Sequence, residues 1–227
     1  MIMATERRAF IIGGSALITS TLALPVLGLQ QKEKTEAPKE DDVSTNEDLM
    51  REHGVLNRIL LIYDEALRRI QAKQKFDTDP LLKAAGLIQK FIEDYHEKLE
   101  EDYLFPRFEK AGKLVDLTRT LREQHKAGRT LTQRIMASVK GGDLQTSAAA
   151  LAGFIRMYRP HEAREDTVLF PALHDIVSKH EYDALGEDFD RIEHQTFGGD
   201  GFDIAVDQVT MIEKQLGIYD LSQFTPK

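Results

Sequence analysis

The 227-residue sequence contains no cysteine and no tryptophan. The absence of cysteine excludes disulfide bonds, thiolate metal sites and thiol catalysis. Any metal site in this chain must therefore be built from imidazole and carboxylate side chains.

The chain also lacks an excess of positive charge. Its 30 basic residues are outnumbered by 38 acidic ones, which gives a formal net charge of −8. Binding to phosphate groups requires clustered Lys and Arg, and no such patch is visible, so we expect no nucleic-acid partner. With 41% hydrophobic and 30% charged residues, the composition fits a soluble globular domain and excludes a protein that crosses a membrane several times.

A long uncharged stretch runs from Ala9 to Gln30, directly after Arg7 and Arg8. The segment from Thr5 to Phe10 resembles the twin-arginine export signal, in which a Phe stands two positions after the second Arg. We therefore expect residues 1–30 to be an export signal that directs the protein to the periplasm, and residues 31–44 to be a flexible linker. The alternative is an uncleaved anchor facing the periplasm, in which case only this N-terminal segment contacts a membrane.

From Ser44 onward, apolar residues recur with helical periodicity, and no strand pattern of any length interrupts them. This periodicity predicts four long helices, over residues 46–74, 79–106, 114–139 and 144–179, the last interrupted by Pro160 and Pro171. Four long helices with short connections predict an all-α fold, an antiparallel four-helix bundle over residues 45–180. Two shorter helices, 182–195 and 204–216, predict a C-terminal helical extension, residues 181–227, that packs on the bundle.

An internal repeat is the most informative feature of the sequence. Residues 96–106 align without a gap on residues 161–171, and both copies read His-Glu-x-x-Glu-acidic-x-x-Leu-Phe-Pro. An earlier helix carries one more histidine before each copy, His53 before the first and His125 before the second. The sequence therefore predicts two similar helical hairpins, paired about a pseudo-two-fold axis.

The spacing within each copy suits a metal ion. Residues four apart on an α-helix are offset by about 40° and one turn, so the His and the second Glu of each copy share a face. Two such faces opposed across a bundle offer imidazoles and carboxylates, and carboxylates can bridge a pair of metals. The predicted ligands are His53, His96, Glu100, His125, His161 and Glu165. Burying so many ionisable groups without a cation would be costly, so we favour a metal centre over a polar seam of paired His and Glu.

These repeated segments, with their partner histidines, resemble the HHE cation-binding branch of the hemerythrin family over about residues 47–179. The resemblance implies two non-haem iron ions, bridged by carboxylates and an oxo or hydroxo group and held by the same six residues. Manganese and zinc also suit a mixed imidazole and carboxylate site. Oxygen carriers of the family have a second histidine on the third helix, where this chain has Arg129. One metal therefore has fewer imidazoles, and its shell could be completed by water, by a tyrosine, or by Glu97, Glu162 or His194, the last reaching in from a fifth helix.

Glu93 and His96 also form the Glu-x-x-His pair that is typical of ferritin-like di-iron proteins. That fold needs a second such pair, but Tyr158 stands where the second Glu should be. His53 and His125 moreover replace its lone carboxylates, so the pattern favours a hemerythrin-like protein.

Three classes of function fit such a centre. The first interpretation is a binding protein for a small ligand such as oxygen or nitric oxide. The alternatives are a redox enzyme that acts on peroxide, oxygen or nitric oxide with an electron donor, and a metal-storage or structural bundle. The sequence alone does not decide whether the chain is an enzyme.

Overall fold

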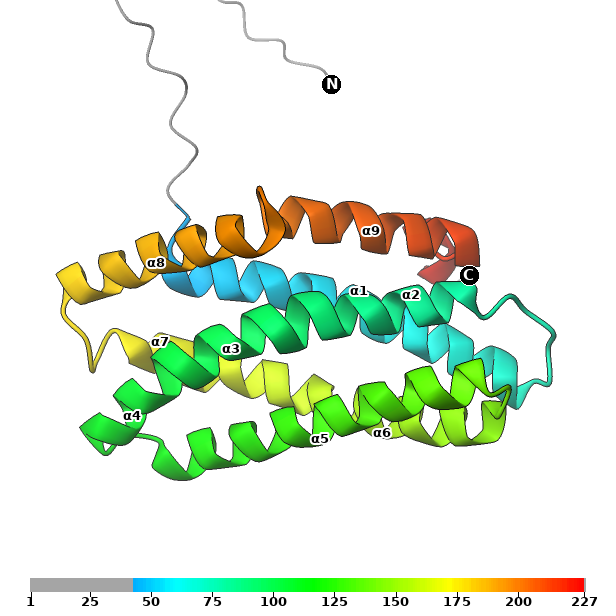
Figure 1. Cartoon of the computed structure of the whole chain (residues 1–227), viewed down its shortest axis with the longest axis horizontal. Coiled ribbons are helices and arrows are strands. Elements are labelled where there is room, and N and C mark those ends of the chain that lie inside the picture. The colour runs from blue at the N-terminus through cyan, green and yellow to red at the C-terminus, as the bar shows by residue number, and fades with distance from the viewer. Residues whose placement is uncertain (1–42, 227) are drawn as a thin grey trace, which may run out of the picture. The chain divides into compact units, whose positions relative to one another are not determined.

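The computed structural model describes residues 43–226, and within that range every regular element is a helix (Figure 1). The predicted export signal or anchor, residues 1–30, lies outside the described residues, as does nearly all of the predicted linker, residues 31–44. Among the helices of residues 43–226, none combines the length and the apolar character that a membrane crossing requires.

The described chain contains four long helical segments and a C-terminal pair. The first and third segments are single α-helices, α1 (Thr45–Gln71) and α5 (Val115–Lys140). The second consists of α2 (Asp79–Leu87), a π-helical stretch η1 (Ile88–His96), α3 (Glu97–Leu99), a second π stretch η2 (Glu100–Leu104) and α4 (Phe105–Ala111). The fourth consists of α6 (Leu144–Arg164), a π stretch η3 (Glu165–Leu169) and α7 (Phe170–Leu173). The C-terminal part consists of α8 (Lys179–Phe197), α9 (Gly201–Leu216) and a short 3-10 helix, η4 (Leu221–Phe224).

Side-chain caps set the starts of α1 and α6. The hydroxyl of Ser44 accepts a hydrogen bond from the backbone N–H of Glu47, so α1 starts at Thr45, one residue before the predicted start. Asn46 instead donates its side-chain amide to the carbonyl of Phe170 at 2.8 Å, which ties the start of α1 to the fourth segment. The carboxylate of Asp143 caps α6 in the same way as Ser44 caps α1.

The prolines of the repeat interrupt the helices less than the sequence suggests. Pro106 and Pro171 stand near the starts of α4 and α7, and the helical path continues through both. A π-helical stretch ends two residues before each of them. A wider turn at this point relieves the clash between the proline ring and the carbonyl four residues earlier, so the helix is not broken. Pro160 lies inside α6.

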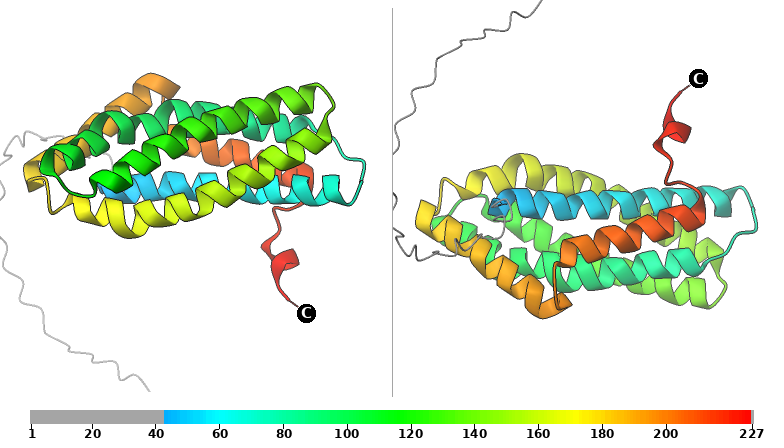
Figure 2. Two further views of the ribbon diagram at one scale, coloured as in Figure 1. Left: turned by 90° about the horizontal axis from the view of Figure 1, so that it is seen from below. Right: turned by 90° about the horizontal axis from the view of Figure 1, so that it is seen from above.

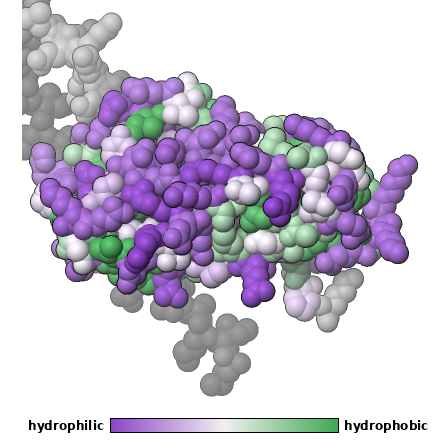
Figure 3. Space-filling model, turned by 60° about the horizontal axis from the view of Figure 1, so that its bottom comes forward, coloured by the Kyte–Doolittle hydropathy of each residue, from purple (hydrophilic) through white to green (hydrophobic). Residues whose placement is uncertain are grey.

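The long segments lie side by side in both views of Figure 2. Helix α6 packs along α5 and α1, and η1 packs against α1 and α5, so the four segments enclose one interior. Helix α9 packs along α1 and α2, and α8 also contacts α1, so the C-terminal pair covers one side of that interior. The face shown in Figure 3 is mainly hydrophilic, with small apolar areas separated by polar side chains.

Apolar side chains fill the interior on one side of the repeated His and Glu residues. Leu104 and Leu169, the leucines of the two Leu-Phe-Pro ends, are both fully buried. Next to them, Phe105 stacks on the ring of His125 at 5.6 Å and Phe170 stacks on the ring of His53 at 5.4 Å. The two halves of the repeat therefore build equivalent apolar layers below the histidines.

Candidate metal centre

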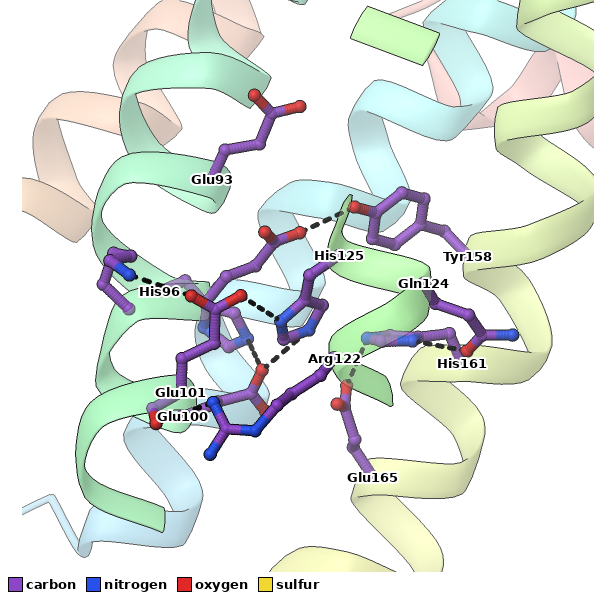
Figure 4. A network of polar contacts seen from close by, with 12 residues as sticks. Glu93, His96, Glu100, Glu101, Arg122, Gln124, His125, Tyr158, His161 and Glu165 are labelled. Carbon is purple, nitrogen blue, oxygen red and sulfur yellow. Dashed lines mark hydrogen bonds and ion pairs between the residues drawn. The ribbon is translucent and has the colours of Figure 1, made fainter. Parts of the chain in front are cut away.

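The six residues predicted as metal ligands lie together in the interior of the described chain. They come from all four long segments and every one is at most 4% exposed; all but His53 are labelled in Figure 4. From α1, η1, η2, α5, α6 and η3 respectively, they are His53, His96, Glu100, His125, His161 and Glu165.

The four imidazoles form two pairs. The ring centroids of His53 and His96 are 4.7 Å apart, and those of His125 and His161 are 5.1 Å apart. Each pair thus combines the lone histidine of a hairpin's first helix with the repeat histidine of the same hairpin.

Each of the two glutamates contacts both pairs. Glu100 Oε2 lies 3.9 Å from His96 Nε2 and 3.3 Å from His125 Nε2. Glu165 Oε2 lies 3.4 Å from His53 Nε2 and 3.1 Å from His161 Nε2. A carboxylate that meets one imidazole of each pair stands where a bridge between two cations would stand.

The atoms that face one another here lack hydrogen-bond partners. Within residues 43–226, no group donates a hydrogen bond of good geometry to either carboxylate oxygen of Glu100 or Glu165. Nε2 of His96 and Nε2 of His125 also have no hydrogen-bond partner there. Buried polar atoms without a partner cost free energy, and a cation removes that cost by accepting their lone pairs. Ligand atoms of Glu100, His125, His161 and Glu165 all lie within 4.8 Å of one another, and so do those of His53, His96 and Glu100. The donor set therefore fits two cations of the kind that imidazole and carboxylate bind.

The electrostatics of the two glutamates agree with this arrangement. Burial raises the pKa of Glu100 well above its ordinary value, and the negative charge of Glu165 raises it further. Burial opposes ionisation of Glu165 too, but the imidazoles of His161 and His53 hold the pKa of that carboxyl below its usual range. Ligand oxygens of Glu100 and Glu165 lie within 4.8 Å of each other. Two ionised carboxylates this close repel each other, and positive charge between them removes the repulsion.

The outer nitrogen of every imidazole is held by an acceptor. His53 Nδ1 lies 2.7 Å from Asp166 Oδ1, and His125 Nδ1 lies 3.1 Å from Glu101 Oε1. These two acceptors occupy the acidic position of the repeat, directly after each bridging glutamate.

The other two imidazoles also have an acceptor at Nδ1. His96 Nδ1 lies 2.5 Å from Glu52 Oε2, and His161 Nδ1 lies 2.9 Å from Gln124 Oε1. Glu52 and Gln124 are the residues directly before the two lone histidines. An acceptor at Nδ1 fixes the tautomer and turns Nε2 toward the centre, as in many metal sites.

The sequence pattern did not predict which side chains hold the outer nitrogens of the imidazoles. These acceptors are Glu52, Glu101, Gln124 and Asp166. The signal was nevertheless in the repeat, because the acceptors occupy equivalent positions in the two halves, directly before a lone histidine or directly after a bridging glutamate. The acidic residue after each bridging glutamate was visible as a repeated position, but a helical pattern alone does not show which imidazole it meets.

The further candidates fall into two groups. Glu97 and Glu162 are buried next to the centre, and other side chains contact both. Glu97 also forms, with Glu101 and His125, a third group whose ligand atoms lie within 4.8 Å of one another. Glu97 pairs with Arg129 at 2.8 Å, and Glu162 accepts a hydrogen bond from Asn57. His194 does not join the cluster, because it is exposed on α8 and its Nδ1 donates to the carbonyl of Asp190.

The ferritin-like reading gains no support from Glu93. Its side chain is buried, but it lies apart from the His and Glu cluster in Figure 4 and belongs to neither group of candidate ligands around Glu100. The cluster that forms is the one built from the lone histidines and the two His-x-x-x-Glu pairs.

Comparison with known proteins agrees with this geometry. Residues 44–173 match the family model for the hemerythrin HHE cation binding domain. Uncharacterized proteins of Mycobacterium tuberculosis and Mycobacterium bovis are 52% identical to this chain over 198 residues, which cover 85% of this chain and 78% of each relative. No solved structure matches the chain. Because the family model spans more than half of the sequence, the protein belongs to the hemerythrin family as a member with an HHE cation-binding domain.

Proposed function

We propose that the protein binds two iron ions in an antiparallel four-helix bundle. His53 and His96 would hold one ion, His125 and His161 the other, and both glutamates of the His-x-x-x-Glu pairs would bridge them. The observation that carries this proposal is that each of these glutamates contacts one imidazole of each pair. Mixed imidazole and carboxylate ligands suit iron, and membership of the family favours it over manganese or zinc.

We infer that the centre binds a small ligand such as oxygen or nitric oxide. Two imidazoles and two shared carboxylates do not fill the coordination shell that iron commonly takes, so positions remain for a small molecule. The position of the extra histidine of oxygen carriers holds Arg129, whose guanidinium pairs with Glu97 and Glu101. The apolar layer of Phe105, Phe170 and the two buried leucines excludes bulk water from one side of the centre. These features support binding of a small, weakly polar molecule.

The test is an anaerobic titration of the reduced, iron-loaded protein with nitric oxide, followed by optical spectroscopy. A saturating spectral change at a fixed ratio of ligand to protein supports a binding protein. Glu165→Gln should abolish the change, whereas Glu93→Gln, which alters another buried carboxylate that lies outside the cluster, should keep it. Continuous consumption of nitric oxide or peroxide would instead favour a redox enzyme. No spectral change in protein that contains iron would contradict the proposal.

A further inference from the structure

Tyr158 is a buried side chain next to the centre that the six candidate ligands do not explain. It lies on α6, is 1% exposed, and its ring centroid is 5.3 Å from that of His161. Its hydroxyl donates a hydrogen bond of 2.6 Å to Glu97 Oε1 (Figure 4). The phenol therefore contacts both a proton-accepting carboxylate and the ring of a candidate metal ligand.

Arg129 holds the carboxylate of Glu97 in place. One terminal nitrogen of its guanidinium lies 2.8 Å from Glu97 Oε2, and the other lies 2.8 Å from Glu101 Oε1. Glu97 Oε2 thus faces a cation while Glu97 Oε1 faces the phenol. The acceptor for the tyrosine proton is fixed at hydrogen-bonding distance, in a region with little access to water.

The pairing of a tyrosine and an arginine with this glutamate, as in Tyr158, Arg129 and Glu97, occurs in one half of the repeat only. At the position of Tyr158 the first copy has Glu93, and at the position of Arg129 the first hairpin has Asn57. Gly128 makes room for the phenol, because a Cβ at this residue would lie 2.0 Å from Tyr158 Oη. The second half therefore departs from the first through side chains that contact one another.

We infer that Tyr158 is a redox-active residue that gives one electron to hydrogen peroxide at the centre while its proton passes to Glu97. The inference rests on the proposed iron centre, which would supply the place where peroxide takes up electrons. Each oxidised chain loses one electron and one proton from the Tyr158 O–H bond and keeps a neutral tyrosyl radical. The second electron would come from a ferrous ion of the proposed centre, which becomes ferric. With the tyrosine proton held by Glu97, the O–O bond of one peroxide breaks to give two hydroxide ions, so that atoms and electrons balance.

The hydrogen bond to Glu97 is what makes this oxidation favourable in a buried position. A phenol that loses an electron but keeps its proton carries a positive charge, which is costly to hold away from water. Transfer of the proton along the bond to Glu97 avoids that charge. Tyr63 provides the contrast: it is fully buried as well, but its hydroxyl has no hydrogen-bond partner among residues 43–226.

The experiment is to mix the full-length, iron-loaded protein, with its iron reduced to the ferrous state, with hydrogen peroxide, freeze it rapidly and record its electron paramagnetic resonance spectrum. We expect a tyrosyl radical signal in the wild type and in Tyr63→Phe, and none in Tyr158→Phe. Glu97→Gln keeps the phenol but cannot accept its proton, so its signal should fall about tenfold or more. Circular dichroism and iron content of each variant show that the fold and the centre are retained.

Two results would overturn the inference: a signal of full size in Tyr158→Phe, or no tyrosyl signal in wild-type protein that contains iron. In either case the proposed iron centre would still stand. If the protein holds no iron, the proposed function fails instead. Photo-oxidation of the same samples by a ruthenium(III) complex then decides whether Tyr158 contributes more radical than Tyr63.

Discussion

Removal of the Asp166 carboxylate should weaken metal binding without unfolding the protein. Asp166 Oδ1 lies 2.7 Å from Nδ1 of the buried His53, and it fixes that imidazole with Nε2 toward the centre. Loss of such an outer contact typically lowers metal affinity about 10–100-fold, which corresponds to about 1.4–2.7 kcal/mol. The side chain of Asp166 is 34% exposed, so Asp166→Ala leaves no large cavity and should cost the fold little.

The assay is a competition titration of Fe²⁺ or Zn²⁺ between the protein and a coloured chelator. Asp102→Ala is a matched control, because it removes the same charge from a side chain that is 58% exposed and pairs only weakly with Lys98, at 3.8 Å. We expect the Asp166 variant alone to lose affinity. Equal affinities in wild type and Asp166→Ala would refute the reasoning, and equal losses in both variants would show that charge alone matters.

Two further predictions concern stability. Phe170 is fully buried and stacks on His53, so Phe170→Ala should cost about 3–5 kcal/mol in urea unfolding, whereas Phe224→Ala, at a residue 53% exposed, should cost within about 0.5 kcal/mol. Burial, followed by the charges of nearby carboxylates, raises the pKa of Glu193 to about 7. Protonated Glu193 therefore stabilises the fold below the ordinary pKa of 4.5, and this contribution is lost as the pH rises toward 7. Glu193→Gln should match wild type at pH 4 and exceed it by about 1–2 kcal/mol at pH 8 in urea unfolding, and a constant difference across this range would contradict the assignment.

The six candidate ligands could be identified from the sequence because their chemistry depends on short-range helical spacing. His96 and Glu100 must share a helix face wherever that helix lies, and the second copy repeats the same constraint. The lone histidines, His53 and His125, could be added because the order of helices is duplicated. Burial of all six residues in one cluster follows from these local rules plus the packing of four amphipathic segments.

The rest depends on contacts that spacing does not determine. The π-helical stretches that begin at Glu100 and Glu165 adjust the turns between the ligands and the prolines, and helical periodicity does not distinguish a π turn from an α turn over so few residues. The partner of Arg129, Glu97, lies on another segment, so helical spacing alone does not predict this ion pair. His194 lies on a helix that packs on the bundle but faces away from the centre.

The most direct test of the central claim is the metal content and optical spectrum of the protein purified without added chelator. We expect about two irons per chain with near-ultraviolet bands of a bridged iron pair. Both should be lost in the Glu100→Ala/Glu165→Ala double variant and kept in Glu93→Gln. Protein without iron, or iron that the double substitution leaves unchanged, would contradict the assignment of a di-iron centre.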